Sequence, residues 1–209
     1  SMLQTELVLN RLEPLKLALP IFLSPTRTRV LAALDDLGTQ PKEYPKLYAD
    51  SFAASLRAAI NDDPIEGWEI QGPSNCLHMR DKETHLKLRF LKEFAYEGDV
   101  PPAGNNQARI TAWVQEPLMD VEATGKRPLK DVRLVLVWKE RNGLFDCTVY
   151  QAETAGDFPK GAKARAVMQI PITPNLNNTS FNPDTSDEEH IVPKKNIVIR
   201  EASKETVTS

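Results

Sequence analysis

The sequence predicts an α+β fold in which N-terminal helices pack on one face of a mostly antiparallel sheet of five or six strands. Three observations lead to this prediction. Apolar residues recur at helical spacing through the first sixty positions, and from Gly67 onward they alternate as in half-buried strands. The dipeptide Asn142-Gly143 is the preferred two-residue turn of a tight hairpin. Helices followed by strands favour segregated layers, and the sheet face away from the helices is the expected working surface.

Three helical segments are expected before residue 63. A short amphipathic segment begins at Leu3 and should end at Pro14, because proline interrupts a helix. A second helix is predicted to begin with Ser24 as its cap and to end at Gly38, where a C-terminal glycine belongs. A third is expected from Tyr44-Pro45 to about residue 61, with one apolar face made of Leu47, Phe52, Leu56 and Ile60.

The first β-hairpin is predicted over residues 76–90, with its turn at Asp81-Lys82. In this register Leu77 faces Leu86, and the apolar residues of both strands share one face. His78 then faces His85 on the other face. That polar face carries Cys76, His78, Arg80, Glu83, His85, Lys87 and Arg89.

Further strands complete the predicted sheet. A short strand covers residues 68–71, and the alternation over residues 108–114 predicts another. The hairpin around Asn142-Gly143 pairs Trp138 with Cys147 and forms a central pair, because both of its faces are partly apolar. A last strand is expected over residues 164–172.

The domain boundaries follow from composition. Residues 2–174 are predicted to form a single domain, with a helical part at 2–63 and a sheet part at 67–174. Residues 175–209 are predicted to form a polar C-terminal arm that is either flexible or able to add a strand to an open sheet edge.

Charge and cysteine content indicate which partners and which cellular compartment to expect. The formal net charge is −3, so any attraction to nucleic acid has to be local. Two distant cysteines, Cys76 and Cys147, are typical of a reduced, intracellular chain, and we expect a cytoplasmic protein. Lys16 and Pro20 interrupt the longest apolar stretch, so no membrane span and no membrane partner are expected.

The polar face of the 76–90 hairpin holds the candidate binding residues. Two imidazoles and a thiol, from His78, His85 and Cys76, offer ligands that zinc or copper prefers. A fourth ligand is missing, and a solvated outer face explains the same residues, so no metal site and no cofactor are assigned. The same face forms a basic stripe that could contact phosphates. The candidate binding residues are therefore Arg80, Lys87, Arg89, His78 and His85.

Enzyme motifs are missing from the sequence. It contains no Gly-x-Ser-x-Gly, no His-Glu-x-x-His, no Cys-x-x-Cys and no dinucleotide glycine fingerprint. The cross-strand pair Lys139 and Asp146 is better explained as a surface ion pair than as part of a nuclease core. No catalytic residue is assigned on this basis, and an enzyme is the less favoured class.

The N-terminal half also bears a resemblance. The segment Ser24-Pro25-Thr26-Arg27-Thr28-Arg29-Val30-Leu31-Ala32-Ala33-Leu34 resembles the first helix of many bacterial repressors, and the order of helix, helix and hairpin resembles winged-helix DNA-binding domains. The resemblance covers about a quarter of the chain. It implies a DNA-binding regulator, although Pro41 and Pro45 fall where the short middle helix of that fold should run.

Two classes of function remain. The first is a non-enzymatic interaction or regulatory protein that binds a partner protein, or a second copy of itself, through the exposed sheet face and the C-terminal arm. The alternative is a DNA-binding regulator that uses the basic hairpin or the winged-helix-like part. A metal-dependent enzyme is a distant third.

Overall fold

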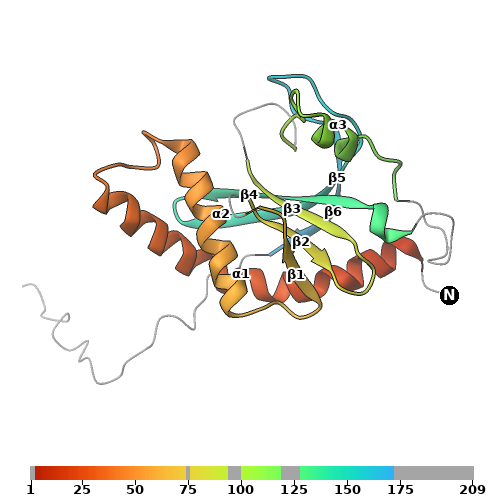
Figure 1. The fold of residues 1–209 in the computed structure, drawn as a ribbon, viewed down its shortest axis with the longest axis horizontal. Helices are drawn as coiled ribbons and strands as arrows, with labels where there is room; N and C mark the ends of the chain where they lie inside the picture. Colours follow the sequence, from red (N-terminus) through yellow and green to blue (C-terminus); the bar gives the residue numbers. More distant parts are fainter. Residues whose placement is uncertain (1–2, 74–75, 94–99, 119–127, 172–209) are drawn as a thin grey trace, which may run out of the picture. The chain divides into compact units, whose positions relative to one another are not determined.

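The computed structural model describes residues 3–73, 76–93, 100–118 and 128–171. It confirms the predicted α+β class: two N-terminal helices pack on a mostly antiparallel sheet of six described strands (Figure 1). The predicted C-terminal arm, residues 175–209, lies outside the described residues.

Helix α1, Gln4–Asp36, is one continuous helix of 33 residues where two separate segments were expected. Pro14, Pro20 and Pro25 lie inside it, and each interior proline costs about 3 kcal/mol. A continuous buried stripe at spacings of three and four outweighs this cost, because one buried large aliphatic side chain contributes about 1.5–3 kcal/mol. The stripe consists of Val8, Leu12, Leu15, Leu19, Leu23, Thr26, Val30 and Leu34.

Helix α2, Pro45–Asp62, has the predicted bounds, with Pro45 in the first turn. Its buried face includes Tyr48, whereas the expected Leu47 is 39% exposed. Phe52 stacks on Trp138 of the sheet with ring centroids 4.3 Å apart. Aromatic packing of this kind fixes α2 against the same sheet face that α1 covers.

The strands follow one another across the sheet in sequence order. They are β1 (Trp68–Gln71), β2 (His78–Asp81), β3 (Lys87–Lys92), β4 (Arg133–Arg141), β5 (Leu144–Ala152) and β6 (Ala164–Ile170). All neighbouring pairs are antiparallel except β3 and β4, which run parallel and are joined by a long connection.

The two predicted hairpins differ in how well their registers were anticipated. In the β4–β5 hairpin the predicted pairs are confirmed, including Trp138 with Cys147, because Asn142-Gly143 fixes the turn. In the β2–β3 hairpin His78 pairs with Arg89 rather than with His85, a shift of four residues. The shift preserves which side chains share a face, because the period of a strand is two.

Residues 108–114 form a helix and not the predicted strand. Helix α3, Gln107–Trp113, begins at Asn106, whose side chain accepts a hydrogen bond from the Arg109 backbone N–H at 2.9 Å. Such a cap favours the helix over an extended chain. Trp113 is buried against the sheet, and its indole N–H donates to the Pro101 carbonyl at 2.9 Å. The short connection η1, Leu129–Asp131, then leads into β4.

The sheet separates two apolar clusters. The first face packs against α1 and α2 and carries residues such as Met79, Leu88, Leu136 and Trp138. The second face, where β4 and β5 place Val135 and Tyr150, is covered by residues 100–113, including α3. This cover leaves the β2–β3 side of the second face to line a cavity, which places the site described below.

Among the described helices, none has the length and apolar character that a membrane span requires.

Candidate functional site

The candidate site lies on the second face of the sheet and is built from two cross-strand rows. In the inner row, Gln71 of β1 pairs with His78 of β2, which pairs with Arg89 of β3. Arg89 in turn pairs with Val135 of β4. Because directly paired residues point to the same side of a sheet, these four side chains stand beside one another on the second face.

The outer row lies two residues away along each strand, which corresponds to about 7 Å. It runs from Glu69 through Arg80 and Lys87 to Arg133. Glu69 accepts a hydrogen bond from Arg80 Nε at 2.7 Å, so this guanidinium is already paired. Among the described residues, no carboxylate forms an ion pair with Lys87 or Arg133.

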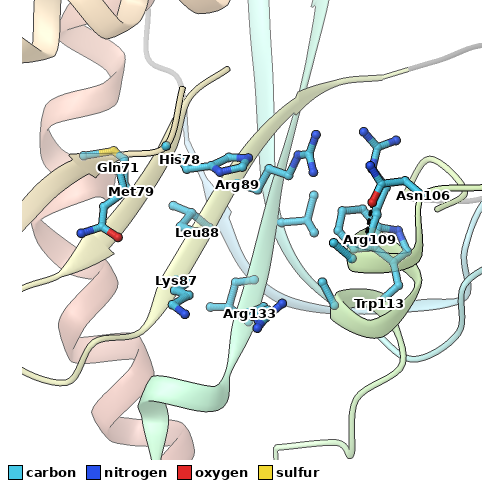
Figure 2. Close-up of a pocket in the computed structure, with 15 residues that line it drawn as sticks. Gln71, His78, Met79, Lys87, Leu88, Arg89, Asn106, Arg109, Trp113 and Arg133 are labelled. Atoms are coloured by element: carbon cyan, nitrogen blue, oxygen red, sulfur yellow. Dashed lines mark hydrogen bonds between the residues drawn. The ribbon is translucent and has the colours of Figure 1, made fainter. Parts of the chain in front are cut away.

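Helix α3 forms the opposite wall. Arg89 from the sheet and Arg109 from α3 both approach the ring of Trp113, each with its guanidinium carbon 5.9 Å from the ring centroid. Figure 2 shows His78 and Arg89 extending from neighbouring strands toward the helix that carries Arg109 and Trp113. Trp113 is only 3% exposed, so it supports the two guanidinium groups and does not offer an open stacking surface.

Together these elements line a cavity of about 480 Å³, which we call the cationic pocket. The size is in the range of small-ligand sites. Among the described residues that line it, none is acidic. The residues that carry or can carry positive charge are His78, Lys87, Arg89, Arg109 and Arg133, and the amides of Gln71 and Asn106 also line it.

Three buried nitrogen atoms of the pocket have no hydrogen-bond partner among the described residues: His78 Nε2, Arg89 Nε and Arg109 Nε. A buried polar atom without a partner costs about 1–3 kcal/mol, and native proteins hold few of them. The three atoms belong to residues of three different elements that line one cavity, which indicates a place for a hydrogen-bond acceptor that comes from outside the chain.

The electrostatics of the pocket agree with this geometry. Burial, with further contributions from Arg89, Arg57 and Arg109, lowers the pKa of His78 from 6.5 to about 4. Burial and then the charge of Arg109 lower the pKa of Arg89. Both shifts have the sign that burial and neighbouring positive charge give to a cationic group.

Arg57 of α2 holds the loop beside the pocket. Its guanidinium donates hydrogen bonds to the carbonyl oxygens of Gln71, Gly72, Pro73 and Cys76, at 3.0 to 3.2 Å. Gly72, at φ +77°, lets the His78 imidazole lie close to the loop backbone, because a Cβ on this residue would lie 3.1 Å from His78 Nδ1. The loop therefore fixes the imidazole in place. The Arg57 guanidinium therefore holds the loop and is not available to a winged-helix-like contact with DNA.

The structure brings together some of the predicted binding residues and separates others. His78, Lys87 and Arg89 line the cationic pocket, as their shared face predicted. Arg80 lies on the same face but pairs with Glu69. His85 lies in the turn, exposed and at φ +61°, and does not face His78. The predicted His78–His85 pair is therefore wrong, because the residue paired with His78 lies four positions further along the chain.

The three side chains that were considered as metal ligands, Cys76, His78 and His85, do not converge. His85 lies in the turn, away from Cys76 and His78, and no cluster of three or more His, Cys, Asp or Glu side chains is found among the described residues.

The helices do not have the arrangement that the winged-helix resemblance implies. Residues 24–34 lie within α1, where Val30 and Leu34 face the core, and Ser24 begins no helix.

Sequence reasoning missed the residues on α3 and β4. Arg109 and Trp113 were placed in a strand, and Arg133 was not singled out. The signal that could have found α3 is Asn106, a good helix cap directly before Gln107.

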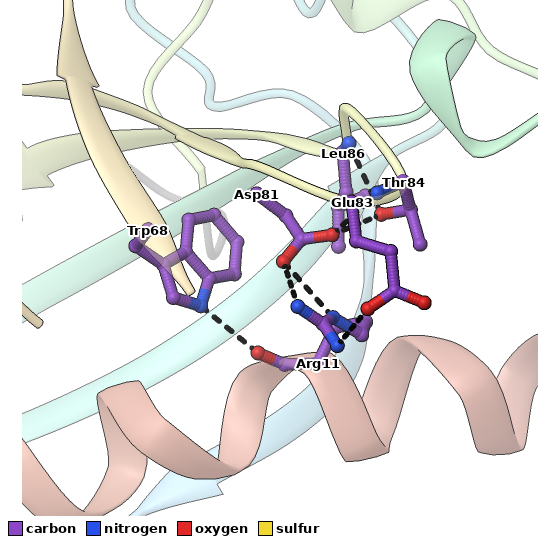
Figure 3. A network of polar contacts seen from close by, with 6 residues as sticks. All are labelled: Arg11, Trp68, Asp81, Glu83, Thr84 and Leu86. Atoms are coloured by element: carbon purple, nitrogen blue, oxygen red, sulfur yellow. Dashed lines mark hydrogen bonds and ion pairs between the residues drawn. The ribbon is translucent and has the colours of Figure 1, made fainter. Parts of the chain in front are cut away.

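A second buried charged cluster lies at the other end of the β2–β3 hairpin (Figure 3). The carboxylate of Asp81, which is fully buried, accepts hydrogen bonds from Arg11 Nε at 2.9 Å and from Arg11 Nη2 at 2.6 Å. Its other oxygen accepts from the backbone N–H and the hydroxyl of Thr84, at 2.7 and 2.6 Å. Arg11 also contacts Glu83, and its carbonyl accepts from the Trp68 indole at 2.9 Å.

This second cluster, which we call the Arg11–Asp81 cluster, is balanced within the chain. Burial alone would raise the pKa of Asp81, but hydrogen bonds from Arg11 and Thr84 and the charge of Arg11 hold it below its ordinary value. The cluster ties the turn of the hairpin to α1 and explains why the turn is wide. Its role is structural.

Comparison of the chain with models of protein families, with curated proteins and with solved structures finds no match.

Proposed function

We propose that the protein is a non-enzymatic binding protein that holds an anionic group of its partner in the cationic pocket. The observation that carries this proposal is that His78, Arg89 and Arg109 line one cavity and that each holds a buried nitrogen atom without a described hydrogen-bond partner. An anion would accept hydrogen bonds from both guanidinium groups, and charge-assisted bonds of this kind are the stronger ones.

Stability of the fold alone does not account for the arrangement. Two guanidinium groups beside one tryptophan, with no acidic side chain among the described residues that line the cavity, repel each other and lose hydration. Groups that lower stability in this way are typical of sites where binding requires them. The charged network on the far end of the same hairpin shows that this chain does supply carboxylates where charge is to be neutralised internally.

The test is thermal unfolding in the presence of polyanions. We expect sodium tripolyphosphate or poly-L-glutamate to raise the midpoint by several degrees at low ionic strength, whereas uncharged dextran leaves it unchanged. The double variant Arg89→Gln/Arg109→Gln should lose the increase. Arg165→Gln removes one exposed charge on β6, away from the pocket, and should keep it. An equal increase in the double variant, or none in the unmodified protein, contradicts the proposal.

The DNA-binding alternative draws support from the same residues. Lys87 and Arg133 extend the cationic pocket along the sheet, and phosphate contacts need only placed cations. Binding of a partner protein or of a second copy through the C-terminal arm remains a separate hypothesis, which gel filtration of a chain ending at residue 174 would test. An unchanged oligomeric state and unchanged partner binding would contradict it.

A further inference from the structure

We infer that the cationic pocket takes two consecutive phosphates of a single nucleic-acid strand, one at the inner row and one at the outer row. This inference rests on the proposed function and names the class of ligand.

The inner subsite is suited to a tetrahedral oxyanion. The three residues that hold the unpartnered nitrogens belong to β2, β3 and α3, and so they line the cavity from separate elements. A phosphate group presents oxygens in several directions, whereas a carboxylate presents two in one plane. Donors that surround the cavity therefore fit a phosphate better.

The outer subsite consists of Lys87 and Arg133, which occupy paired positions on β3 and β4. The backbone of Arg133 is fixed by Gln115, which accepts from its N–H at 2.9 Å and donates to its carbonyl at 2.8 Å. Two neighbouring strands thus present two cations at one level of the sheet. The free ends of both side chains are exposed, as contacts to a flexible backbone require.

The separation of the two subsites selects the ligand. Lys87 and Arg89 are two residues apart on β3, which places their Cα atoms about 7 Å apart. Two phosphorus atoms that share a bridging oxygen lie much closer together than this, so a diphosphate would not span both rows. Phosphates joined through a sugar do span it. The cavity is also walled by α3 on one side, which favours one strand over a duplex.

The experiment measures fluorescence anisotropy of a 5′-labelled oligothymidylate ten residues long. Single strands lose affinity with a slope of about −0.7 per neutralised phosphate in a plot of log K against log salt concentration. We expect a slope of about −1.4 for the unmodified protein and about −0.7 for Lys87→Gln/Arg133→Gln. Arg80→Gln is the matched control on the same row, and because Glu69 already pairs with Arg80, its slope should stay unchanged.

The competitors separate this inference from the proposed function. Poly-L-glutamate or tripolyphosphate that displaces the oligonucleotide fully at equal charge concentration would overturn the inference and leave an anion-binding protein. Equal slopes for the unmodified protein and the Lys87→Gln/Arg133→Gln variant would also overturn it. A chain that binds none of the three probes at low salt would overturn both proposals.

Discussion

The two ends of the β2–β3 hairpin treat buried charge in opposite ways. At the turn, Asp81 is fully buried, and its hydrogen bonds come from Arg11 and Thr84 (Figure 3). At the other end, Arg89 and Arg109 are partly buried beside the same tryptophan, and no carboxylate lines the cavity in the described part of the chain (Figure 2). The Arg11–Asp81 cluster satisfies its hydrogen bonds within the chain, whereas the buried nitrogens of the cationic pocket have no described acceptor. Local charge balance, and not burial alone, therefore distinguishes a structural cluster from a candidate binding site.

The largest effect is expected from Asp81→Ala. This change leaves Arg11 without its buried partner and leaves the donors of Thr84 unsatisfied, so the free energy of unfolding should fall by about 3 kcal/mol. Urea denaturation at neutral pH measures it. A loss below about 1 kcal/mol would show that the Arg11–Asp81 cluster does not hold the turn against α1, and the comparison would fail.

The same carboxylate predicts an acid dependence. The pKa of Asp81 in the folded chain lies below its ordinary value of 3.8, so its stabilisation is present above that value. It is lost as the pH falls through the lower, folded value. In urea denaturation from pH 5 to pH 2, the unmodified protein should therefore lose more stability than Asp81→Ala does. Parallel curves would contradict the assignment.

Arg89→Met is expected to change stability in the opposite direction. Methionine keeps most of the length of the side chain and removes a buried charge that has no described carboxylate partner, so the free energy of unfolding should rise by about 1 kcal/mol. The gain should come with loss of polyanion binding. Destabilisation of the size predicted for Asp81→Ala would show that Arg89 has a structural partner.

His78 predicts a pH dependence of stability for the cationic pocket. Its pKa of about 4 in the folded chain lies below the ordinary 6.5, so the unfolded chain takes up a proton first as the pH falls. The free energy of unfolding should therefore decrease from pH 6.5 to pH 4, and His78→Gln should lack this part of the decrease. His85→Gln, in the exposed turn, is the matched control and should retain it. A decrease of equal size in His78→Gln would contradict the burial of a neutral imidazole.

The smallest effect is expected from Glu83→Gln. Glu83 contacts Arg11 from the solvent side, with its side chain 71% exposed, and exposed ion pairs contribute about 0.2–1 kcal/mol. A change of about 0.5 kcal/mol or less in urea denaturation is therefore expected. A loss as large as that of Asp81→Ala would mean that net charge, and not burial, explains the Arg11–Asp81 cluster.

Much of the fold was predictable from the sequence because its signals are local. Asn142-Gly143 determines both turn and register of the β4–β5 hairpin. The period-two pattern correctly placed His78, Lys87 and Arg89 on one face even where the register was wrong. What failed depended on long-range contacts: the turn after Asp81 is wide because Arg11, seventy residues earlier, takes part in it.

The residues of α3 in the candidate site were not predicted for the same reason. Seven residues, Gln107–Trp113, show apolar positions that suit a short strand as well as a helix. Packing of Trp113 on the second face and the cap at Asn106 decide for the helix, and the first of these is not visible in the sequence. Arg109 therefore reaches the cationic pocket only once the tertiary fold is known. Likewise, the prolines of α1 suggested breaks that burial of its apolar stripe overrides.

The most direct test follows the arginine Nε–H signals in a ¹⁵N-labelled sample during titration with the oligothymidylate, with each signal assigned through its single-site variant. Arg89 and Arg109 have unpartnered Nε–H groups, whereas that of Arg11 is bonded to Asp81. Binding in the cationic pocket predicts that the signals of Arg89 and Arg109 move together, saturate at one concentration and leave that of Arg11 in place. Unmoved signals of Arg89 and Arg109 at saturating oligonucleotide, or an equal shift of all three, would contradict it.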